Sequence, residues 1–258
     1  MQFDHFRVEI DERDEVAYIT FDYPEKMNCI SMKARRQLRK AFEDLDENPA
    51  VRFIVLRGQG GKAFSSGGDI PDFLNYTPEE LSNLHDNISA PERCSKPVIS
   101  AVDGYCFGVG FELALAGDFI IATKRSVFAL PEINLGMIPG SGGTQRMARI
   151  LGPIRTKWLT MRGARIPAEQ AYELGLISRV VENDQLEAAV AELLGELRRF
   201  SPLTLRVLKR VINASWDAPL HVGLTLEGFA YGLLRSTEDF AEGVKAFMEK
   251  RTPSFRGR

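Results

Sequence analysis

Two glutamates and two glycine-rich turns lie within residues 103–146, and together they could carry out acid–base chemistry. The turns are residues 108–110 (Gly-Val-Gly) and 140–143 (Gly-Ser-Gly-Gly), and each runs into a segment with a helical pattern. Glu112 follows the first turn, and Glu132 ends a Leu-Pro-Glu sequence after a short apolar run. Glycine lets a ligand approach the backbone closely, and N–H groups at a helix start favour negative charge. Paired carboxyl groups beside such donors predict a general acid and a general base next to an oxyanion hole.

Each half of this pattern also has an ordinary structural explanation. A glycine-rich turn before a helix is often only a tight turn, and a lone glutamate after proline is usually on the surface. Glu112 could simply suit the dipole at a helix start. Ser141 has no His-Asp partner in a hydrolase pattern, which argues against a serine nucleophile. The occurrence of both carboxyl groups and both turns in one segment favours a site.

A third glycine-rich segment, residues 58–70, directly follows a short apolar strand predicted over residues 53–56. Loops that bind ligands collect at the carboxyl ends of strands in open α/β sheets. The spacing of the glycines matches neither a P-loop nor the dinucleotide-binding fingerprint. A binding loop is therefore expected here, with a flexible hairpin-like loop as the alternative.

The elements that must position these residues predict an α/β fold. Alternating and β-branched side chains over residues 6–10 and 16–21 predict a hairpin. Ser31 is placed to cap a helix that extends to about Glu47. The apolar residues of that helix follow helical spacing and predict one buried face: Leu38, Ala41, Phe42 and Leu45. Strands followed by helices recur downstream, which is typical of α/β proteins. The further strands are expected at 96–102, 119–122, 127–130 and 177–181, and the further helices at 110–116, 142–151, 154–161 and 166–175.

Two segments depart from this alternation of strands and helices. Residues 78–88 predict one polar helix that could serve as a mobile lid or pocket wall. From residue 186 onward the pattern predicts helices almost exclusively, at 186–200, 202–215, 219–234 and 238–250. We expect a core domain with the active site at residues 1–195 and a helical region at 196–258. The apolar faces of that region exceed what a small bundle buries, which predicts a subunit interface, with packing on the core as the alternative.

Composition excludes several classes of protein. The 258 residues have 44% hydrophobic content and a net charge of −2, so bulk electrostatics suggests neither a nucleic-acid nor a membrane partner. Three scattered cysteines are too few for a disulfide framework or a zinc site, and no metal-binding cluster is visible. The charged start of the chain has no apolar signal segment, and no run is long enough to cross a membrane. A cytoplasmic protein is expected.

The stretches DGYCFGVGFELALAGDFIIA and FALPEINLGMIPGSGGTQRMAR resemble the signature region of the crotonase (enoyl-CoA hydratase/isomerase) superfamily. The resemblance extends from the segment near Pro24 to residues 247–251, with several motifs in the same order and spacing. It implies a spiral of ββα units followed by a helical subdomain that forms a trimer interface. It also implies a homo-oligomer, either a trimer or a hexamer made of two trimers.

The resemblance implies roles for the central residues. The N–H groups of Gly68 and Val109 would form the oxyanion hole for a thioester enolate. Position 109 departs from the family, which usually has glycine there, and the valine should stiffen the turn and narrow the pocket. Glu112 and Glu132 match the subgroup of hydratases that keeps both carboxyl groups, one to activate water and one to protonate Cα.

Coenzyme A contacts are implied in the same way. Two residues match an early loop, Lys26 and Met27, although a surface lysine needs no ligand. Residues of the glycine-rich segment would hold the adenine through backbone groups: Ala63, Ser65, Gly67, Asp69 and Ile70. Phe247 and Lys250 match positions that reach the coenzyme A of a neighbouring subunit. Apart from the coenzyme A of the substrate, no cofactor is expected.

The expected activity is hydration of a trans-2-enoyl-CoA to a 3-hydroxyacyl-CoA, or the reverse dehydration, in the degradation of fatty or cyclic acyl-CoAs. Two alternatives remain. An enoyl-CoA isomerase or a ring-cleaving β-oxoacyl-CoA hydrolase would use the same oxyanion hole. A non-catalytic scaffold that binds coenzyme A or RNA is the other, although the near-neutral charge and the intact pair of glutamates count against it.

Overall fold

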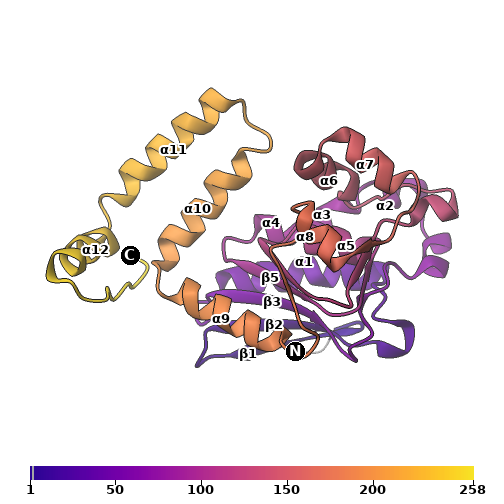
Figure 1. The fold of residues 1–258 in the computed structure, drawn as a ribbon, viewed down its shortest axis with the longest axis horizontal. Helices are drawn as coiled ribbons and strands as arrows, with labels where there is room; N and C mark the ends of the chain where they lie inside the picture. The colour runs from indigo at the N-terminus through magenta and orange to yellow at the C-terminus, as the bar shows by residue number, and fades with distance from the viewer. Residues whose placement is uncertain (2) are drawn as a thin grey trace. The chain divides into compact units, whose positions relative to one another are not determined.

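Between residues 53 and 129, successive β-strands of the chain alternate between two sheets. A computed structural model describes Met1 and residues 3–258. Contacts divide the chain into two units, one of Met1–Cys94 with Val98–Val190 and one of Ser95–Pro97 with Ala191–Arg258. Figure 1 shows the elements in chain order, and both sheets belong to the first unit.

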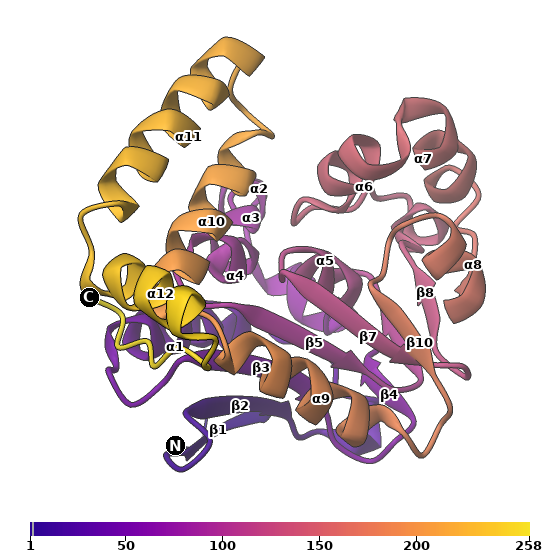
Figure 2. The same cartoon turned by 60° about the vertical axis from the view of Figure 1, so that its left-hand side comes forward.

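The larger sheet contains six strands in the order β1-β2-β3-β5-β7-β10 (Figure 2). It begins with the predicted antiparallel hairpin, and its other pairings are parallel. All five residues of β5 are buried, as expected for a parallel strand covered on both faces. The strands are β1 (Phe6–Asp11), β2 (Val16–Phe21), β3 (Phe53–Gly58), β5 (Val98–Val102), β7 (Phe119–Thr123) and β10 (Arg179–Val181).

The smaller sheet contains four short strands in the order β4-β6-β8-β9. They are β4 (Ala63–Ser65), β6 (Tyr105–Phe107), β8 (Val127–Ala129) and β9 (Ile166–Pro167). The pairs β3/β4, β5/β6 and β7/β8 each place one strand in each sheet and are followed by helices. Because each pair advances one position in both sheets, the chain climbs as a spiral of ββα units. The fold class implied by the resemblance is confirmed.

The smaller sheet also corrects the sequence-based picture. Residues 58–70 are not a flexible loop, because β4 forms within them and pairs with β6. No strand was predicted at β6. The strands β7 and β8 flank the predicted turn at 123–126 but enter different sheets. Three-residue strands carry too little periodicity to be recognised, and their pairing depends on partners far away in the chain.

Helix α1 (Met32–Glu47) forms where the sequence predicts it. The Ser31 side chain accepts a hydrogen bond from the Ala34 N–H at 3.0 Å, which satisfies one of the donors at the helix start. The four residues of the predicted apolar face are all buried, and so is Arg35. Helix α1 therefore carries a charged side chain into the interior of the first unit.

The predicted single helix over 78–88 is wrong. The chain forms three short helices instead, α2 (Pro78–Ser82), α3 (His85–Ile88) and α4 (Ala90–Arg93). Thr77 and Glu80 form a capping box that supports only the first turn. Within 78–88 only Leu84 and Ile88 are buried.

The remaining helices of the first unit include two that begin at the glycine-rich turns, α5 and α6. Helix α5 (Val109–Leu115) is buried along its whole length, which fixes the direction of its first turn. Gly175 has φ +76° just after α8, the left-handed conformation in which helices commonly end. The others are α6 (Gly143–Leu151), α7 (Pro153–Thr160) and α8 (Ala168–Glu173), with the 3-10 turns η1 (Pro24–Lys26), η2 (Ile70–Asn75) and η3 (Glu132–Leu135).

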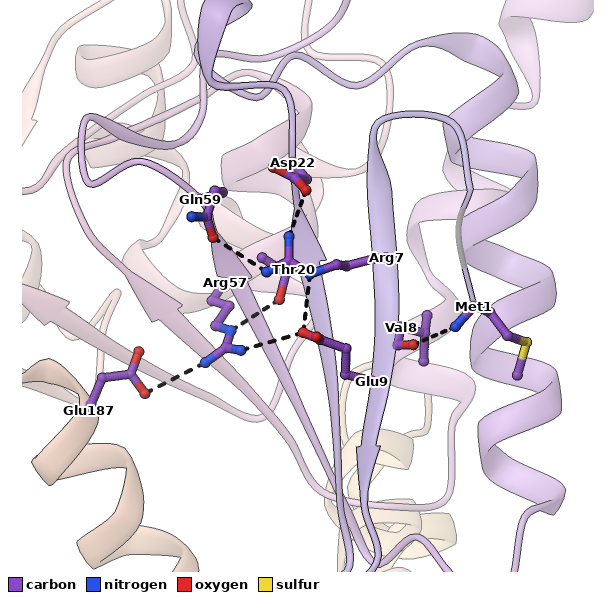
Figure 3. Close-up of polar contacts among 9 residues, drawn as sticks. All are labelled: Met1, Arg7, Val8, Glu9, Thr20, Asp22, Arg57, Gln59 and Glu187. Carbon is purple, nitrogen blue, oxygen red and sulfur yellow. Dashed lines mark hydrogen bonds and ion pairs between the residues drawn. The ribbon is translucent and has the colours of Figure 1, made fainter.

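Polar side chains on β1, β2 and β3 form a chain of contacts that reaches the start of α9 (Figure 3). Arg57 donates to the Thr20 hydroxyl at 3.0 Å and pairs with Glu187 at 3.8 Å. Arg7 pairs with Glu9 at 3.1 Å and donates to Asp22 at 2.7 Å. Surface pairs of this kind contribute little individually.

The second unit consists mainly of helices. Its main elements are α10 (Pro202–Ala214), α11 (Leu220–Leu234) and α12 (Glu238–Glu249), and α9 (Leu186–Arg198) begins in the first unit. Helices α10 and α11 lie side by side (Figures 1 and 2). Helix α11 has no buried residue, although its sequence is apolar. No helix among the described residues is long and apolar enough to cross a membrane.

Candidate active site

Two glycine-rich loops from different parts of the chain meet where β4 and β6 end. A Cβ atom on Gly67 would lie 3.3 Å from the carbonyl oxygen of Phe107 and 3.8 Å from the Cα atom of Gly108. Gly67 has φ +111°, and Gly108 has φ +52° with ψ −128°. Glycine adopts these conformations, whereas residues with a Cβ atom rarely do. Because β4 and β6 are parallel neighbours, both loops leave the same edge of the smaller sheet.

The two predicted oxyanion-hole donors, the N–H groups of Gly68 and Val109, follow these glycines. Val109 is the first residue of α5, so its N–H has no partner within the helix. Neither N–H makes a hydrogen bond among the residues that the structure describes. Val109 has an ordinary helical backbone, because the positive φ falls on Gly108 instead. The valine therefore leaves the N–H in place.

Glu112 is held by the second glycine-rich turn. The side chain is 1% exposed and comes from the first turn of α5. Its Oε1 accepts hydrogen bonds from the N–H groups of Ser141 at 2.8 Å and Gly143 at 2.9 Å. Two backbone donors suit a negatively charged oxygen. Residues 140–143 were predicted to offer N–H groups to a negative charge, and in the structure two of these groups hold the Glu112 side chain.

Glu132 has a contrasting environment. It begins η3, directly after β8, and its side chain is half-buried. A Cβ atom on Gly108 would lie 3.1 Å from its Oε1, so this carboxyl group faces the donor loop. Its Oε2 is buried and has no hydrogen-bond partner in the described part of the chain. Burial raises the pKa of Glu132 from 4.5 to about 7, and the negative charge of Glu112 adds to this rise.

The environments of the two carboxyl groups therefore suit different roles in acid–base chemistry. A carboxylate that accepts two N–H bonds is suited to act as a base, whereas a carboxyl group with a pKa near 7 can still donate a proton at neutral pH. An unpartnered oxygen on Glu132 leaves a position for a substrate or water hydrogen bond. Environments that separate the protonation of neighbouring carboxyl groups are typical of acid–base pairs.

Arg35 is the site residue that the sequence interpretation missed. Its guanidinium lies beside the Ser141 hydroxyl, with 3.4 Å between Nη1 and Oγ. The positive charge of Arg35 also acts on Glu132 and lowers its pKa, which partly opposes the effect of burial. A signal was present: Arg35 stands three positions before Leu38, on the helical face that was predicted to be buried.

The early loop predicted to contact coenzyme A is clamped against the glycine-rich segment. Lys26 pairs with Asp69 across 3.4 Å, and Met27 and Asn28 both have positive φ. The buried Asn28 amide donates to the carbonyl oxygens of Gln59 at 2.9 Å and Ala63 at 2.8 Å. Asn28 thus connects the two segments, a role that the sequence interpretation also missed.

The other predicted coenzyme A residues differ in position. Ala63 and Ser65 are buried, and the Ser65 hydroxyl accepts a hydrogen bond from the Gly67 N–H at 3.2 Å, so only their backbone groups remain for a ligand. Ile70 is 43% exposed beside Asp69. Phe247 and Lys250 belong to the second unit, where Phe247 is 85% exposed and Lys250 caps α12 with φ +54°. Within the described residues, no group of three or more His, Cys, Asp or Glu side chains could hold a metal ion.

Comparison with known proteins adds independent findings. The family model for enoyl-CoA hydratase/isomerase matches residues 11–258. Carnitinyl-CoA dehydratase from Salmonella typhi is 37% identical over 257 residues, which span 93% of this chain and 94% of the relative. A crystal structure of a Geobacillus kaustophilus HTA426 protein named enoyl-CoA hydrates subunit I superposes with a TM-score of 0.94 at 36% identity, covering 100% of both chains. The crystal structure of enoyl-CoA hydratase from Bacillus anthracis gives a TM-score of 0.91 at 33% identity, covering 99% of this chain and 100% of that one.

Proposed function

This chain belongs to the enoyl-CoA hydratase/isomerase family, and we propose that it adds water to a trans-2-enoyl-CoA to form a 3-hydroxyacyl-CoA, or catalyses the reverse dehydration. The observation that carries this proposal is the pair of carboxyl groups with opposite environments beside two backbone donors. Glu112 accepts two N–H bonds, whereas burial raises the pKa of Glu132 to about 7. Hydration needs both a base and an acid, and this pair supplies them.

In the proposed mechanism, Glu112 removes a proton from water, and the resulting hydroxide forms a bond to Cβ. The electron pair of the double bond moves toward the thioester, and the N–H groups of Gly68 and Val109 stabilise the negative charge on its oxygen. Glu132 then donates its proton to Cα. Glu112 ends protonated and Glu132 ionised, and exchange with solvent restores the starting state.

The proposed reaction balances without a redox cofactor or a metal, because water supplies both groups that are added. Coenzyme A is part of the substrate in this proposal, with Lys26 near its phosphates and backbone groups of residues 63–70 near its adenine. The buried side chain of Val109 supports a narrow acyl pocket. A cytoplasmic location remains part of the proposal and rests on the three scattered cysteines.

The test is a panel of trans-2-enoyl-CoAs that differ in chain length, branching and ring content. We expect loss of the conjugated enoyl-thioester absorbance and a product heavier by the mass of one water. A product of unchanged mass with a shifted double bond would identify an isomerase instead, and release of free acid or ring opening would identify a hydrolase. If no thioester in the panel changes although coenzyme A binds, the scaffold alternative replaces the enzyme.

We also propose a trimer-based assembly in which the second unit contributes Phe247 and Lys250 to a neighbour's coenzyme A. The support is the apolar surface of α11 and α12, where several large side chains are exposed. They include Leu220, Phe229, Leu233, Phe247 and Met248. Apolar patches of this size are usually covered by a partner.

Lys250→Asn tests this assignment, because asparagine removes the charge but tolerates the left-handed backbone of position 250. We expect coenzyme A binding to weaken by about 3- to 10-fold, as for the loss of a contact of about 1 kcal/mol. The molar mass from light scattering should not change. Lys245→Ala removes an exposed lysine from the same helix and should leave both properties unchanged. A monomeric wild-type protein with normal affinity for coenzyme A would contradict the assembly and the shared site together.

A further inference from the structure

Arg35 is a buried cation beside the two glutamates, and the proposed chemistry does not use it. Arg35 belongs to the buried face of α1, and the residue is 2% exposed. The Phe73 ring lies beneath its guanidinium at 5.2 Å from Cζ. A Cβ atom on Gly68 would lie 2.8 Å from its Nη2, so the guanidinium adjoins the donor loop. The charged groups that act on it are Glu112 from α5, Glu132 from η3 and Asp72 from η2.

Hydrogen bonding does not explain why this position carries arginine. The Arg35 side chain makes one hydrogen bond in the described part of the chain, a long contact of 3.4 Å to the Ser141 hydroxyl. Its Nε is buried without a partner. A guanidinium has five N–H donors, and burying a charge is costly unless other charges or hydrogen bonds compensate. The compensation for Arg35 must therefore come mainly from the nearby carboxylates.

Arg146 is a second buried arginine that contacts Ser141, and its hydrogen bonding differs from that of Arg35. It is 5% exposed, and it pairs with Glu92 through contacts of 2.5 Å and 2.7 Å. It also donates to the Ser141 carbonyl oxygen and to the Ser89 hydroxyl, both at 2.9 Å. Arg146 is a structural clamp with its donors satisfied. Arg35 lies as deep but acts on its surroundings through its charge.

We propose that Arg35 is a positioning residue whose buried positive charge balances the negative charge of the Glu112–Glu132 pair and holds the Ser141 turn against Glu112. This inference rests on the proposed function for its consequence in catalysis. One proton on the pair leaves one negative charge, which Arg35 balances. Two protons would leave no base, and no proton would leave no acid. Asp72 adds a negative charge on the far side, where the Met32 N–H at the start of α1 donates to it at 3.2 Å.

The direct test follows the ionisation of Glu132 in the free protein, without any substrate. Carboxyl ¹³C chemical shifts of labelled glutamate are measured against pH, and the Glu132 signal is identified by its loss in Glu132→Gln. Burial lowers the pKa of Arg35 to about 10, so the residue is still charged at neutral pH. Removing this cation by Arg35→Met should move the Glu132 midpoint upward from about 7, by about one unit or more. Arg35→Lys, which retains a charge, should show a smaller shift.

The kinetic test uses the pH dependence of kcat/KM for enoyl-CoA hydration. Without the cation Glu132 holds its proton more tightly, so the alkaline limb of the bell-shaped profile of Arg35→Met should move to higher pH. Because the acid then stays protonated to higher pH, Arg35→Met should keep its activity in alkaline conditions in which the activity of the wild type declines. Arg36→Met is the matched control, since Arg36 is the exposed neighbour on the same helix, and its profile should match that of the wild type.

A uniform loss of activity at every pH, with an unmoved Glu132 midpoint, would overturn the proposal and leave Arg35 a structural role. Should Arg35→Met fail to fold, Arg35→Gln removes the same charge while it keeps a donor for Ser141, and the same shift is expected. The failure of the proposed function is distinguishable. If wild-type protein hydrates no enoyl-CoA, the titration of Glu132 still supports or refutes the effect of Arg35.

Discussion

Glu112→Gln is expected to lower kcat/KM for enoyl-CoA hydration by about 100- to 10,000-fold, the usual contribution of a general base. Glutamine can still accept the N–H bonds that Ser141 and Gly143 give to Oε1 in the native chain. The shape of the site should therefore persist, and the loss should reflect proton transfer. Glu132→Gln should cause a loss of similar size, because the amide has no proton to give to Cα. Substrate consumption under single-turnover conditions measures both.

Protein stability provides the control for Glu132→Gln. The pKa of Glu132 is about 7 in the folded chain, against 4.5 for the ordinary group. Between these two pH values the folded state keeps a proton that the unfolded state has lost, so stability from this group falls as the pH rises through the window. Above pH 7 the ionised carboxylate destabilises the fold by about 1–3 kcal/mol. Glutamine removes this effect, so the variant should unfold at a higher temperature than wild type at pH 8, with little difference at pH 4.5.

An inactive Glu132→Gln protein that is more stable than wild type at pH 8 would show that activity was not lost through unfolding. A variant that is less stable at pH 8 would contradict the buried, unpartnered state of this carboxyl group. Activity within tenfold of wild type in both glutamine variants would remove the acid–base roles altogether.

Gly108→Ala is expected to reduce kcat by about 100-fold or more while the protein remains folded. The backbone of Gly108 (φ +52°, ψ −128°) strains any residue with a Cβ atom, by about 1–3 kcal/mol. The new Cβ atom would lie 3.1 Å from Oε1 of Glu132 and 3.6 Å from the Cα atom of Gly67. It would therefore displace the proton donor and the facing loop together, and a shift of about 1 Å can cost about 100-fold in rate.

Gly136→Ala is the control that separates the displacement of Glu132 from the effect of backbone strain alone. Gly136 has φ +69°, and a Cβ atom there would meet no atom within 4 Å. Both variants should lower the temperature of unfolding, but only Gly108→Ala should abolish most of the activity. Steady-state kinetics together with thermal unfolding makes the comparison. Equal losses of activity in the two variants would show that the Gly108 contact with Glu132 is unimportant.

Local patterns in the sequence are sufficient for much of this fold. The alternation in residues 6–21 specifies the first hairpin, and Ser31 with the periodic apolar residues after it specifies α1. These elements depend on neighbours within a few positions, so short-range spacing reveals them. The glycine-rich turns and the two glutamates are equally visible, because the chemistry belongs to the residue types themselves.

Pairings between distant segments are not visible in that way. The three-residue strands β4 and β6 form because parallel partners lie beside them. Residues 78–88 form two short helices rather than the one that their sequence pattern predicts. In each case the free energy comes from contacts across the chain, which local propensity does not contain.

The same distinction applies to the site. The sequence contains Glu112 and Glu132 twenty positions apart, but it does not tell that their environments differ or that the pKa of Glu132 is raised. That difference arises because Ser141 and Gly143 donate to Glu112, while burial isolates one oxygen of Glu132. Arg35, more than seventy positions before either, adds a third charge to the pair. Desolvation and through-space charge set the pKa of a carboxyl group, and both depend on the folded surroundings rather than on chain order.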